Sequence, residues 1–209
     1  KSRWLCVLCV SAAQLFLGCS GGKPPPGVLA YSNSAAPQTL DPSKMTGQIE
    51  NNIIINLLEG LTRLNPQSLQ QEPGMAESWR ISADRRTYTF YLRRAVWSDG
   101  APVKADDFVY SWLRTLNPET GAEYAYQLYY IKGAQEYNSG KGKKEDVQIR
   151  AMDARTLRVE LNDPIPYFLG LTSFMTLLPV RRDIIERWGE TWTRPGHFAS
   201  NGPYLLAEH

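Results

Sequence analysis

The sequence predicts a fold that mixes α-helices with β-strands, of the α/β or α+β class, from three observations. Apolar and polar residues alternate over 87–92, which indicates a strand with one buried face. Apolar residues recur at helical spacing over 47–59 and again after residue 105. Two further alternating segments, joined by a turn, lie within 147–161 and are typical of a β-hairpin.

The first part of the chain has the pattern of a secretory signal peptide. Lys1 and Arg3 precede a mainly apolar run over 4–17, which is too short to span a bilayer comfortably. Cys19 directly follows a small residue, as in a bacterial lipobox, where the cysteine becomes the lipid-bearing N-terminus. We therefore expect residues 1–19 to be a signal peptide with a lipobox, the alternative being a plain signal peptide with an incidental cysteine. The proline-rich stretch 20–27 is predicted to be a flexible tether.

Composition narrows the class of protein. The chain has 209 residues, of which 43% are hydrophobic, so it can form one large domain or two small ones. A formal net charge of +2 argues against nucleic acid as the main partner. No cysteine follows Cys19, so the folded part is predicted to have no internal disulfide.

The elements before the central strand are a short strand over 28–32 and a helix over 47–59. Leu40-Asp41-Pro42 between them favours an extended or turn conformation, because the residue before a proline avoids the helical region. Gly60 is well placed to end the helix.

After the strand over 87–92, the residues Ser98-Asp99-Gly100 predict a tight turn. A helix should begin near Ala105, with Asp106 and Asp107 in its first turn, where the helix dipole favours anions. Residues 117–144 include a solvated loop, Gly140 to Lys144, which lacks the spacing of a phosphate-binding loop.

The remaining elements follow the hairpin. Its strands, with alternating apolar residues at 147–151 and 157–161, are joined by a turn at Asp153-Ala154-Arg155. The apolar run 172–178 predicts a buried strand, and 180–188 predicts a helix closed by Gly189. A last strand is expected from Tyr204.

Catalysis and metal binding have little support in the sequence. His197 and His209 are its only histidines, and no nucleophile elbow, metalloprotease motif or cysteine pair occurs after residue 19. Asp106 and Asp107 are adjacent on a helix, so their carboxylates should point in different directions. We therefore predict no enzyme activity, no cofactor and no metal site. A cluster of four tyrosines, Tyr124, Tyr126, Tyr129 and Tyr130, could line a ligand cleft, although three of them are expected in the core.

Several motifs in order resemble the extracytoplasmic oligopeptide-binding proteins, the solute-binding subunits of peptide ABC importers. The most specific is residues 92–112, LRRAVWSDGAPVKADDFVYSW. Others are LDP at 40–42, LLEGLTRLNP at 57–66, PGMAESW at 73–79, PIPYF at 164–168 and the end of the chain. Lys104 stands where this family usually has threonine, so the helix after it should lack a capping hydroxyl.

The resemblance implies a type II periplasmic-binding-protein clamp of two lobes with an inserted small domain. On that basis residues 28–65 and 171–209 belong to the first lobe, and 66–170 form the small domain. Both chain ends suggest a fragment that stops before the second lobe.

The resemblance also implies a ligand site. Its cleft-lining loop falls on Thr46, Gly47 and Gln48, its cleft tyrosine on Tyr124, and the Phe174 region adds to the same wall. Familiar members carry an acidic residue where this chain has Thr46, which leaves the backbone contacts of Gly47 and Gln48.

The implied function is capture of oligopeptides outside the cytoplasmic membrane and delivery to a permease, with a lipid anchor on the membrane. The alternatives are the same fold binding a nickel chelate, a sugar or a murein peptide, or an anchored interaction module. An exported hydrolase is the least favoured.

Overall fold

The computed structural model describes residues 27, 33 and 35–207. The predicted signal peptide, Cys19, nearly all of the tether, the strand over 28–32 and His209 lie outside these residues. The chain divides into two units, Lys1–Asn33 and Ser34–His209, and the description below concerns the second. Among the described residues, no helix has the length and apolar character needed to cross a membrane.

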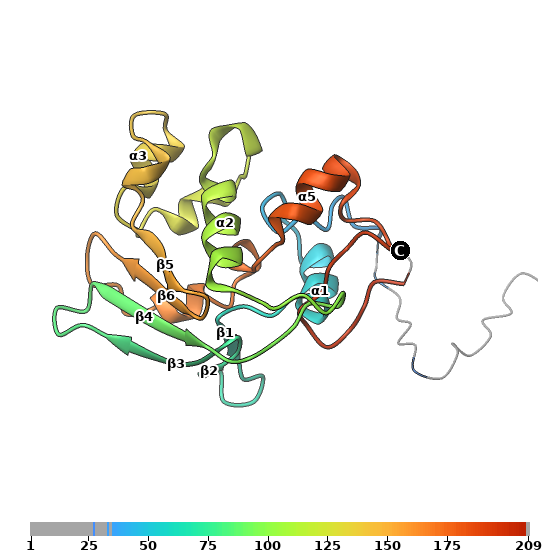
Figure 1. Ribbon diagram of the computed structural model, residues 1–209, viewed down its shortest axis with the longest axis horizontal. Coiled ribbons are helices and arrows are strands. Elements are labelled where there is room, and N and C mark those ends of the chain that lie inside the picture. Colours follow the sequence, from blue (N-terminus) through green and yellow to red (C-terminus); the bar gives the residue numbers. More distant parts are fainter. Residues whose placement is uncertain (1–26, 28–32, 34, 208–209) are drawn as a thin grey trace, which may run out of the picture. The chain divides into compact units, whose positions relative to one another are not determined.

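The centre of this unit is an antiparallel sheet of four strands in the order β3-β4-β6-β5 (Figure 1). The expected strand over 87–92 and the expected hairpin over 147–161 are its inner strand β4 and its pair β5–β6. In a separate antiparallel pair, β1–β2, the first strand agrees with the helix-to-strand junction that the family resemblance implies at 57–66, whereas β2 and β3 were not predicted. The strands are β1 Thr62–Leu64, β2 Gln71–Pro73, β3 Ala76–Ile81, β4 Thr87–Leu92, β5 Ile149–Asp153 and β6 Thr156–Glu160.

Five α-helices and several 3-10 turns complete the described part of the chain. The helices are α1 Gln48–Leu57, α2 Ala105–Leu116, α3 Ala134–Asn138, α4 Phe168–Leu171 and α5 Arg182–Trp188. The 3-10 turns are η1 Pro118–Thr120, η2 Ala125–Leu128, η3 Lys144–Asp146, η4 Met175–Leu177 and η5 Gly189–Thr191. The fold is therefore mixed, as the sequence predicts, and α5 ends at Gly189 as expected.

Two predicted strands are wrong. Residues 172–178 are buried for the most part, but they leave α4 and form the turn η4. Burial without alternation does not distinguish a strand from a helical turn, so the apolar run was misleading. Residues 204–207 form no strand; Tyr204 donates one backbone hydrogen bond to Asn56, at 3.2 Å.

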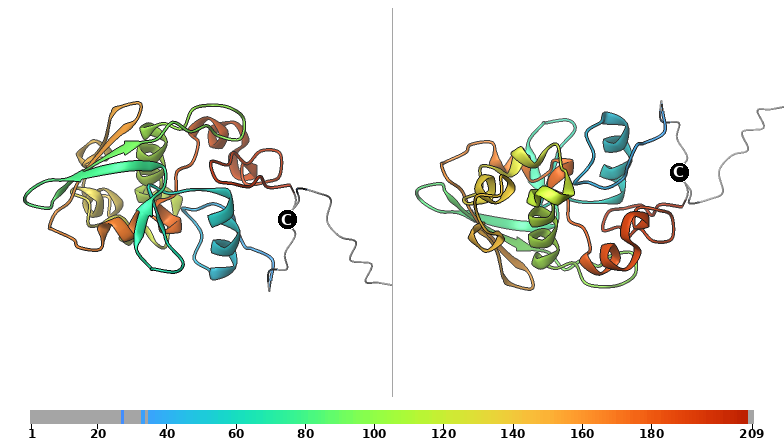
Figure 2. Two further views of the ribbon diagram at one scale, coloured as in Figure 1. Left: turned by 90° about the horizontal axis from the view of Figure 1, so that it is seen from below. Right: turned by 90° about the horizontal axis from the view of Figure 1, so that it is seen from above.

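The core lies between the sheet and α2. Seen from below, the strands lie in front of this helix (Figure 2). On β4 the residues Tyr88, Phe90 and Leu92 are buried, which is the face that the alternation predicts. Trp112 of α2 is fully buried, and its indole N–H donates to the Leu177 carbonyl at 2.8 Å. This bond fixes η4 against α2.

The turn before α2 forms as the sequence predicts. Gly100 has φ +86°, a left-handed conformation that favours glycine, and the Asp99 carboxylate accepts the Ala101 N–H at 3.1 Å. Lys104 supplies no hydroxyl cap; instead the Asp107 carboxylate accepts the Lys104 N–H at 2.8 Å and the Trp97 indole N–H at 3.1 Å. Burial raises the pKa of Asp107. Since Asp106 is exposed, the two carboxylates diverge, as expected.

Gly60 has a different role from the expected helix end. α1 ends at Leu57, and Leu58 is already extended. A Cβ on Gly60 would lie 2.5 Å from the Thr172 carbonyl oxygen and 3.3 Å from a methyl of Leu178. The glycine therefore lets the chain after α1 pass close to the segment that follows α4.

Replacing Gly60 with alanine is expected to lower the free energy of unfolding by about 1–3 kcal/mol, because the contact is with backbone that has little freedom to move. Urea denaturation followed by tryptophan fluorescence measures this. The matched control is Gly170→Ala in α4, where the nearest atom to a new Cβ is 3.8 Å away. That variant should keep its stability or gain a few tenths of a kcal/mol. Equal stability of the two variants would contradict the close approach.

Candidate functional site

Three segments that the sequence analysis assigned to one ligand wall meet in the structure. The Tyr124 hydroxyl, at the start of η2, donates to the Thr46 carbonyl at 3.1 Å. The Tyr124 ring lies 5.9 Å from the Phe174 ring between centroids, at an interplanar angle of 46°. Residues far apart in the sequence thus form a continuous surface. Their role in binding remains a prediction.

The loop residues Thr46 and Gly47 lead directly into α1, whose first residue is Gln48. Gly47 is the N-cap residue, and a Cβ there would lie 2.2 Å from a carboxylate oxygen of Glu50. Glu50 is buried and accepts the Gln38 N–H at 2.8 Å, so the chain before the loop folds over this carboxylate. The Gln48 amide donates to Asn52 at 2.8 Å, which holds its side chain along the helix. The Gln48 side chain is therefore engaged within α1.

A further aromatic residue, Tyr126, extends the surface. Its ring meets the Tyr124 ring edge to face, with 5.9 Å between centroids and an interplanar angle of 86°, and the residue is 51% exposed. We call Phe174, Tyr124 and Tyr126 the aromatic wall. Sequence reasoning did not single out Tyr126 from its neighbours, and only its place within a tyrosine-rich stretch could have suggested it.

The expectation that three of the four clustered tyrosines lie in the core is wrong. Tyr124 and Tyr129 pack against the core but stay partly exposed, and Tyr126 is half exposed. Tyr130 is also partly exposed and contacts the Tyr167 ring, at 5.6 Å between centroids. A 3-10 turn has about three residues per turn, so successive tyrosines point in different directions instead of sharing one buried face.

A buried ion pair positions the loop that carries Thr46. The Arg114 guanidinium of α2 donates to both carboxylate oxygens of Asp41, at 2.8 and 2.6 Å, and to the Ser43 hydroxyl at 2.9 Å. Asp41 also accepts the Ser43 N–H at 3.0 Å. Burial disfavours the charged guanidinium and is the largest single effect on its pKa, but the hydrogen bonds to Asp41 and the attraction of that carboxylate together outweigh it and raise the pKa of Arg114. These hydrogen bonds fix the loop to α2.

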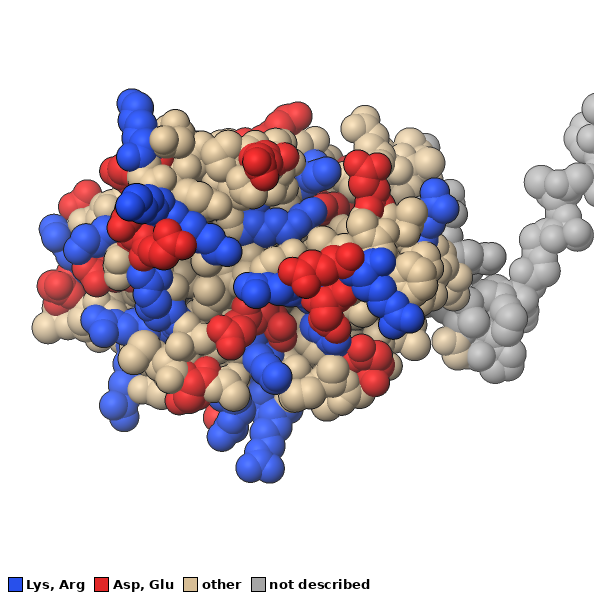
Figure 3. Space-filling model, turned by 45° about the horizontal axis from the view of Figure 1, so that its top comes forward, with Lys and Arg blue, Asp and Glu red and all other residues tan. Residues whose placement is uncertain are grey.

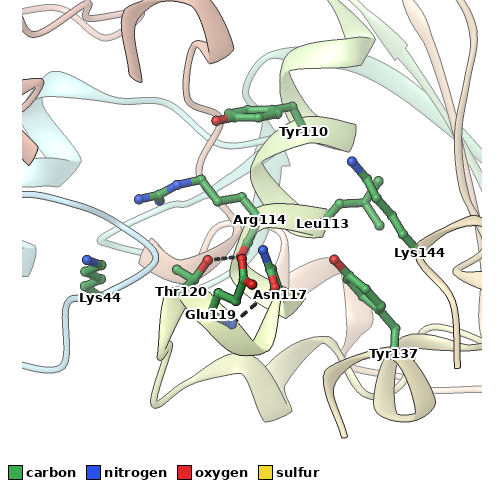
Figure 4. Close-up of a pocket in the computed structure, with 9 residues that line it drawn as sticks. All are labelled: Lys44, Tyr110, Leu113, Arg114, Asn117, Glu119, Thr120, Tyr137 and Lys144. Carbon is green, nitrogen blue, oxygen red and sulfur yellow. Dashed lines mark hydrogen bonds between the residues drawn. The ribbon is translucent and has the colours of Figure 1, made fainter. Parts of the chain in front are cut away.

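Two cavities lie beside this ion pair, not at the aromatic wall. The larger, of about 380 Å³, is lined by residues of α2, η1, α3 and η3 together with Lys44 (Figure 4). Its lining residues are Lys44, Tyr110, Leu113, Arg114, Asn117, Glu119, Thr120, Tyr137 and Lys144. Figure 4 shows the Arg114 guanidinium pointing toward the side of Lys44, with Lys144 on the opposite side. The smaller cavity, of about 250 Å³, shares Lys44 and Arg114.

Neither cavity includes Thr46, Gly47, Gln48, Tyr124 or Phe174. The aromatic wall therefore lies outside both of these cavities. An enclosed peptide site would need a second surface opposite it.

The described residues were searched for side chains that could hold a metal ion together. No group of three or more metal-ligating side chains is found among them. The His197 ring stacks on Trp188 with 3.6 Å between centroids, and its Nδ1 lies 2.9 Å from the Thr191 carbonyl oxygen. These contacts give His197 a structural role in the packing around α5.

The sequence of this chain matches the model of one protein family. Residues 70–209 match the model described as bacterial extracellular solute-binding proteins, family 5 Middle. The chain belongs to this family. Family 5 consists of solute-binding transport proteins rather than enzymes, and its members act outside the cytoplasm.

Relatives in family 5 cover most of the chain. It is 44% identical to the oligopeptide-binding protein OppA of Bacillus subtilis, over 81% of this chain and 31% of OppA. It is 43% identical to the periplasmic oligopeptide-binding protein OppA of Escherichia coli, over 86% of this chain and 33% of that protein. The chain thus spans about a third of the length of these relatives.

A solved structure agrees with the fold. Haemophilus influenzae OppA, in complex with RPPGFSPFR, superposes with a TM-score of 0.81 at 39% identity, over 85% of this chain and 35% of that one.

Proposed function

We propose that this chain contributes one wall of an oligopeptide-binding site in a substrate-binding component of an ABC importer. The observation that carries the proposal is the meeting of Tyr124 with Thr46 and Phe174, three segments that the family resemblance assigns to the ligand cleft. The peptide-binding names of the OppA relatives support the choice of ligand.

The proposed binding mode uses both parts of this surface. The rings of the aromatic wall give apolar contact area with little entropy to lose, and Tyr126 is half exposed. Backbone groups of the loop 46–48 would pair with the extended peptide backbone, which is the same for every peptide sequence. Water between the wall and the peptide side chains would accommodate their variety at small cost. Broad peptide specificity follows from this arrangement.

The domain division remains part of the proposal. The four-stranded sheet lies entirely within 66–170, which supports a separate small domain there. Tyr124 from this region reaches Thr46 from 28–65, so the aromatic wall would lie where the small domain meets the first lobe. In the two-lobed clamp that the resemblance implies, a second lobe would supply the facing wall.

The export of the protein and its attachment to a membrane are also part of the proposal. The pattern of residues 1–19 supports export, with lipid attachment at Cys19 and residues 20–27 as a tether to the membrane. A tethered binding protein could deliver its peptide to permease subunits in the same membrane.

Calorimetric titration of the full-length gene product with a mixed pool of tri- to pentapeptides tests the function. We expect saturable heat with peptides and none with a nickel chelate or simple sugars. Heat with the chelate or sugar alone would overturn the peptide assignment while keeping the family. Silence with every ligand would favour an anchored interaction module.

A further inference from the structure

The sheet has a second face, turned away from α2, and its central positions carry arginines. The strand register pairs Arg80 of β3 with Thr89 of β4, Thr89 with Arg158 of β6, and Arg158 with Arg150 of β5. Directly paired residues share one face of a sheet. These four residues therefore form one row across all four strands, which we call the arginine row. Strands are spaced about 4.8 Å apart, so the row spans about 14 Å.

The row is open to solvent. Arg80, Arg150 and Arg158 are exposed, whereas their sequence neighbours Leu157 and Val159 are fully buried on the opposite face. Neither cavity described above includes a member of the row.

The positive charges in the row have no carboxylate partners among the described residues. All ion pairs found among the described residues involve other arginines or a lysine. The Arg150 guanidinium donates to the carbonyls of Glu145, Val147 and Ile149, which holds it in place without neutralising it. The Arg80 guanidinium lies 5.9 Å from the centroid of the Tyr91 ring.

An acidic residue of the same strand is paired with a lysine outside the row. Glu160 follows Arg158 by two residues on β6, but it pairs with Lys132 at 2.9 Å. Arg158 and Arg150 lie directly opposite each other, an arrangement of like charges that costs stability unless an anion lies between them. By contrast, the surface in Figure 3 mixes acidic and basic side chains.

We propose that the arginine row is a docking surface for anionic phospholipid, used when the protein lies on a membrane. Guanidinium groups match phosphate oxygens in pairs of hydrogen bonds, which favours phosphate-bearing partners. An open sheet face would bind one small anion weakly, whereas a bilayer presents many phosphates to the whole row at once. The extracellular character of the family favours a membrane over nucleic acid. This role is independent of peptide capture.

Vesicle co-sedimentation of the full-length gene product tests the proposal. The protein is prepared without residues 1–19, so that neither the apolar run nor a lipid on Cys19 contributes, and binding is compared between phosphatidylcholine vesicles with and without phosphatidylglycerol. We expect binding that requires phosphatidylglycerol and weakens at high salt. Arg80→Gln with Arg158→Gln should lower the partition coefficient roughly 30-fold, about fivefold for each arginine.

The matched control is Lys141→Gln with Lys143→Gln, which removes the same charge from an exposed loop outside the sheet. It should retain binding to within about twofold of the wild type. The urea midpoint of the Arg80/Arg158 variant should not fall, because it removes a like-charge pair. Equal losses in the two double variants, or no phosphatidylglycerol dependence in the wild type, would overturn the proposal. Capture of polyglutamate without vesicle binding would also overturn it and indicate an acidic protein partner.

Discussion

Replacing Arg114 with methionine is expected to lower the free energy of unfolding by about 3–5 kcal/mol, the cost of leaving a buried charge unpaired. The Asp41 side chain is 6% exposed and the Arg114 side chain 16%, so water replaces little of what is lost. Asp41 would keep only the Ser43 N–H among the contacts described above. Urea denaturation of the variant and the wild type gives the difference in unfolding free energy. The dependence of this free energy on urea concentration is measured for each protein separately.

Two further variants separate the unpaired charge from lost packing. Asp41→Asn combined with Arg114→Met removes both charges and keeps an acceptor for the Ser43 N–H, so it should recover a large part of the loss. Arg63→Met removes an arginine from an ion pair in which the arginine side chain is 64% exposed, and should cost less than about 1 kcal/mol. A loss below 1 kcal/mol for Arg114→Met would show that the pair contributes little to holding the loop 41–46.

The sequence predicted the elements whose periodicity is strong. β4 alternates through all six of its residues, and the β5–β6 hairpin has an apolar face on both sides of a clear turn. α2 combines helical spacing with acidic residues in its first turn. In these segments, local pattern and tertiary burial agree, so sequence alone was sufficient.

The wrong or missing predictions concern segments whose apolar residues follow neither a strand nor a helix period. Residues 172–178 are contacted both by α2 and by the chain after α1. Their buried residues therefore do not alternate with exposed ones as they would in a strand with one buried face. β1 and β2 have three residues each, too few for alternation to be recognised. Gly60 was assigned to a helix end because a close backbone approach has no signal in a single sequence.

The candidate site shows the same division. Thr46, Tyr124 and Phe174 came from family resemblance, and the structure brings them together. The pair Asp41–Arg114 joins residues 73 positions apart, a separation at which no local pattern predicts contact. Tyr126 was missed because only the 3-10 geometry of η2 decides which tyrosine lies beside Tyr124.

Replacing Tyr124 with alanine in the full-length gene product is expected to weaken peptide binding about 30-fold. Aromatic residues at the centre of an interface commonly contribute 2 kcal/mol or more, and Tyr124 is the only member of the aromatic wall that contacts both other rings. Its loss also frees the Thr46 carbonyl from the tyrosine hydroxyl, so the loop 46–48 loses one of its fixed points. Tyr124→Phe keeps the ring and removes this one hydrogen bond, so its affinity should fall only about fivefold.

Tyr130→Ala is the matched control, because this tyrosine lies in the same segment but contacts Tyr167 instead of the aromatic wall. Calorimetry with one peptide from the binding pool should find its dissociation constant unchanged within about twofold. Tyr126→Ala should fall between the control and Tyr124→Ala, since it removes the outer ring and leaves the contact with Thr46 intact. Unchanged affinity in Tyr124→Ala would remove this residue from the site. An equal loss in Tyr130→Ala would mean that the tyrosine segment acts through the stability of the fold, and that its rings do not contact the peptide.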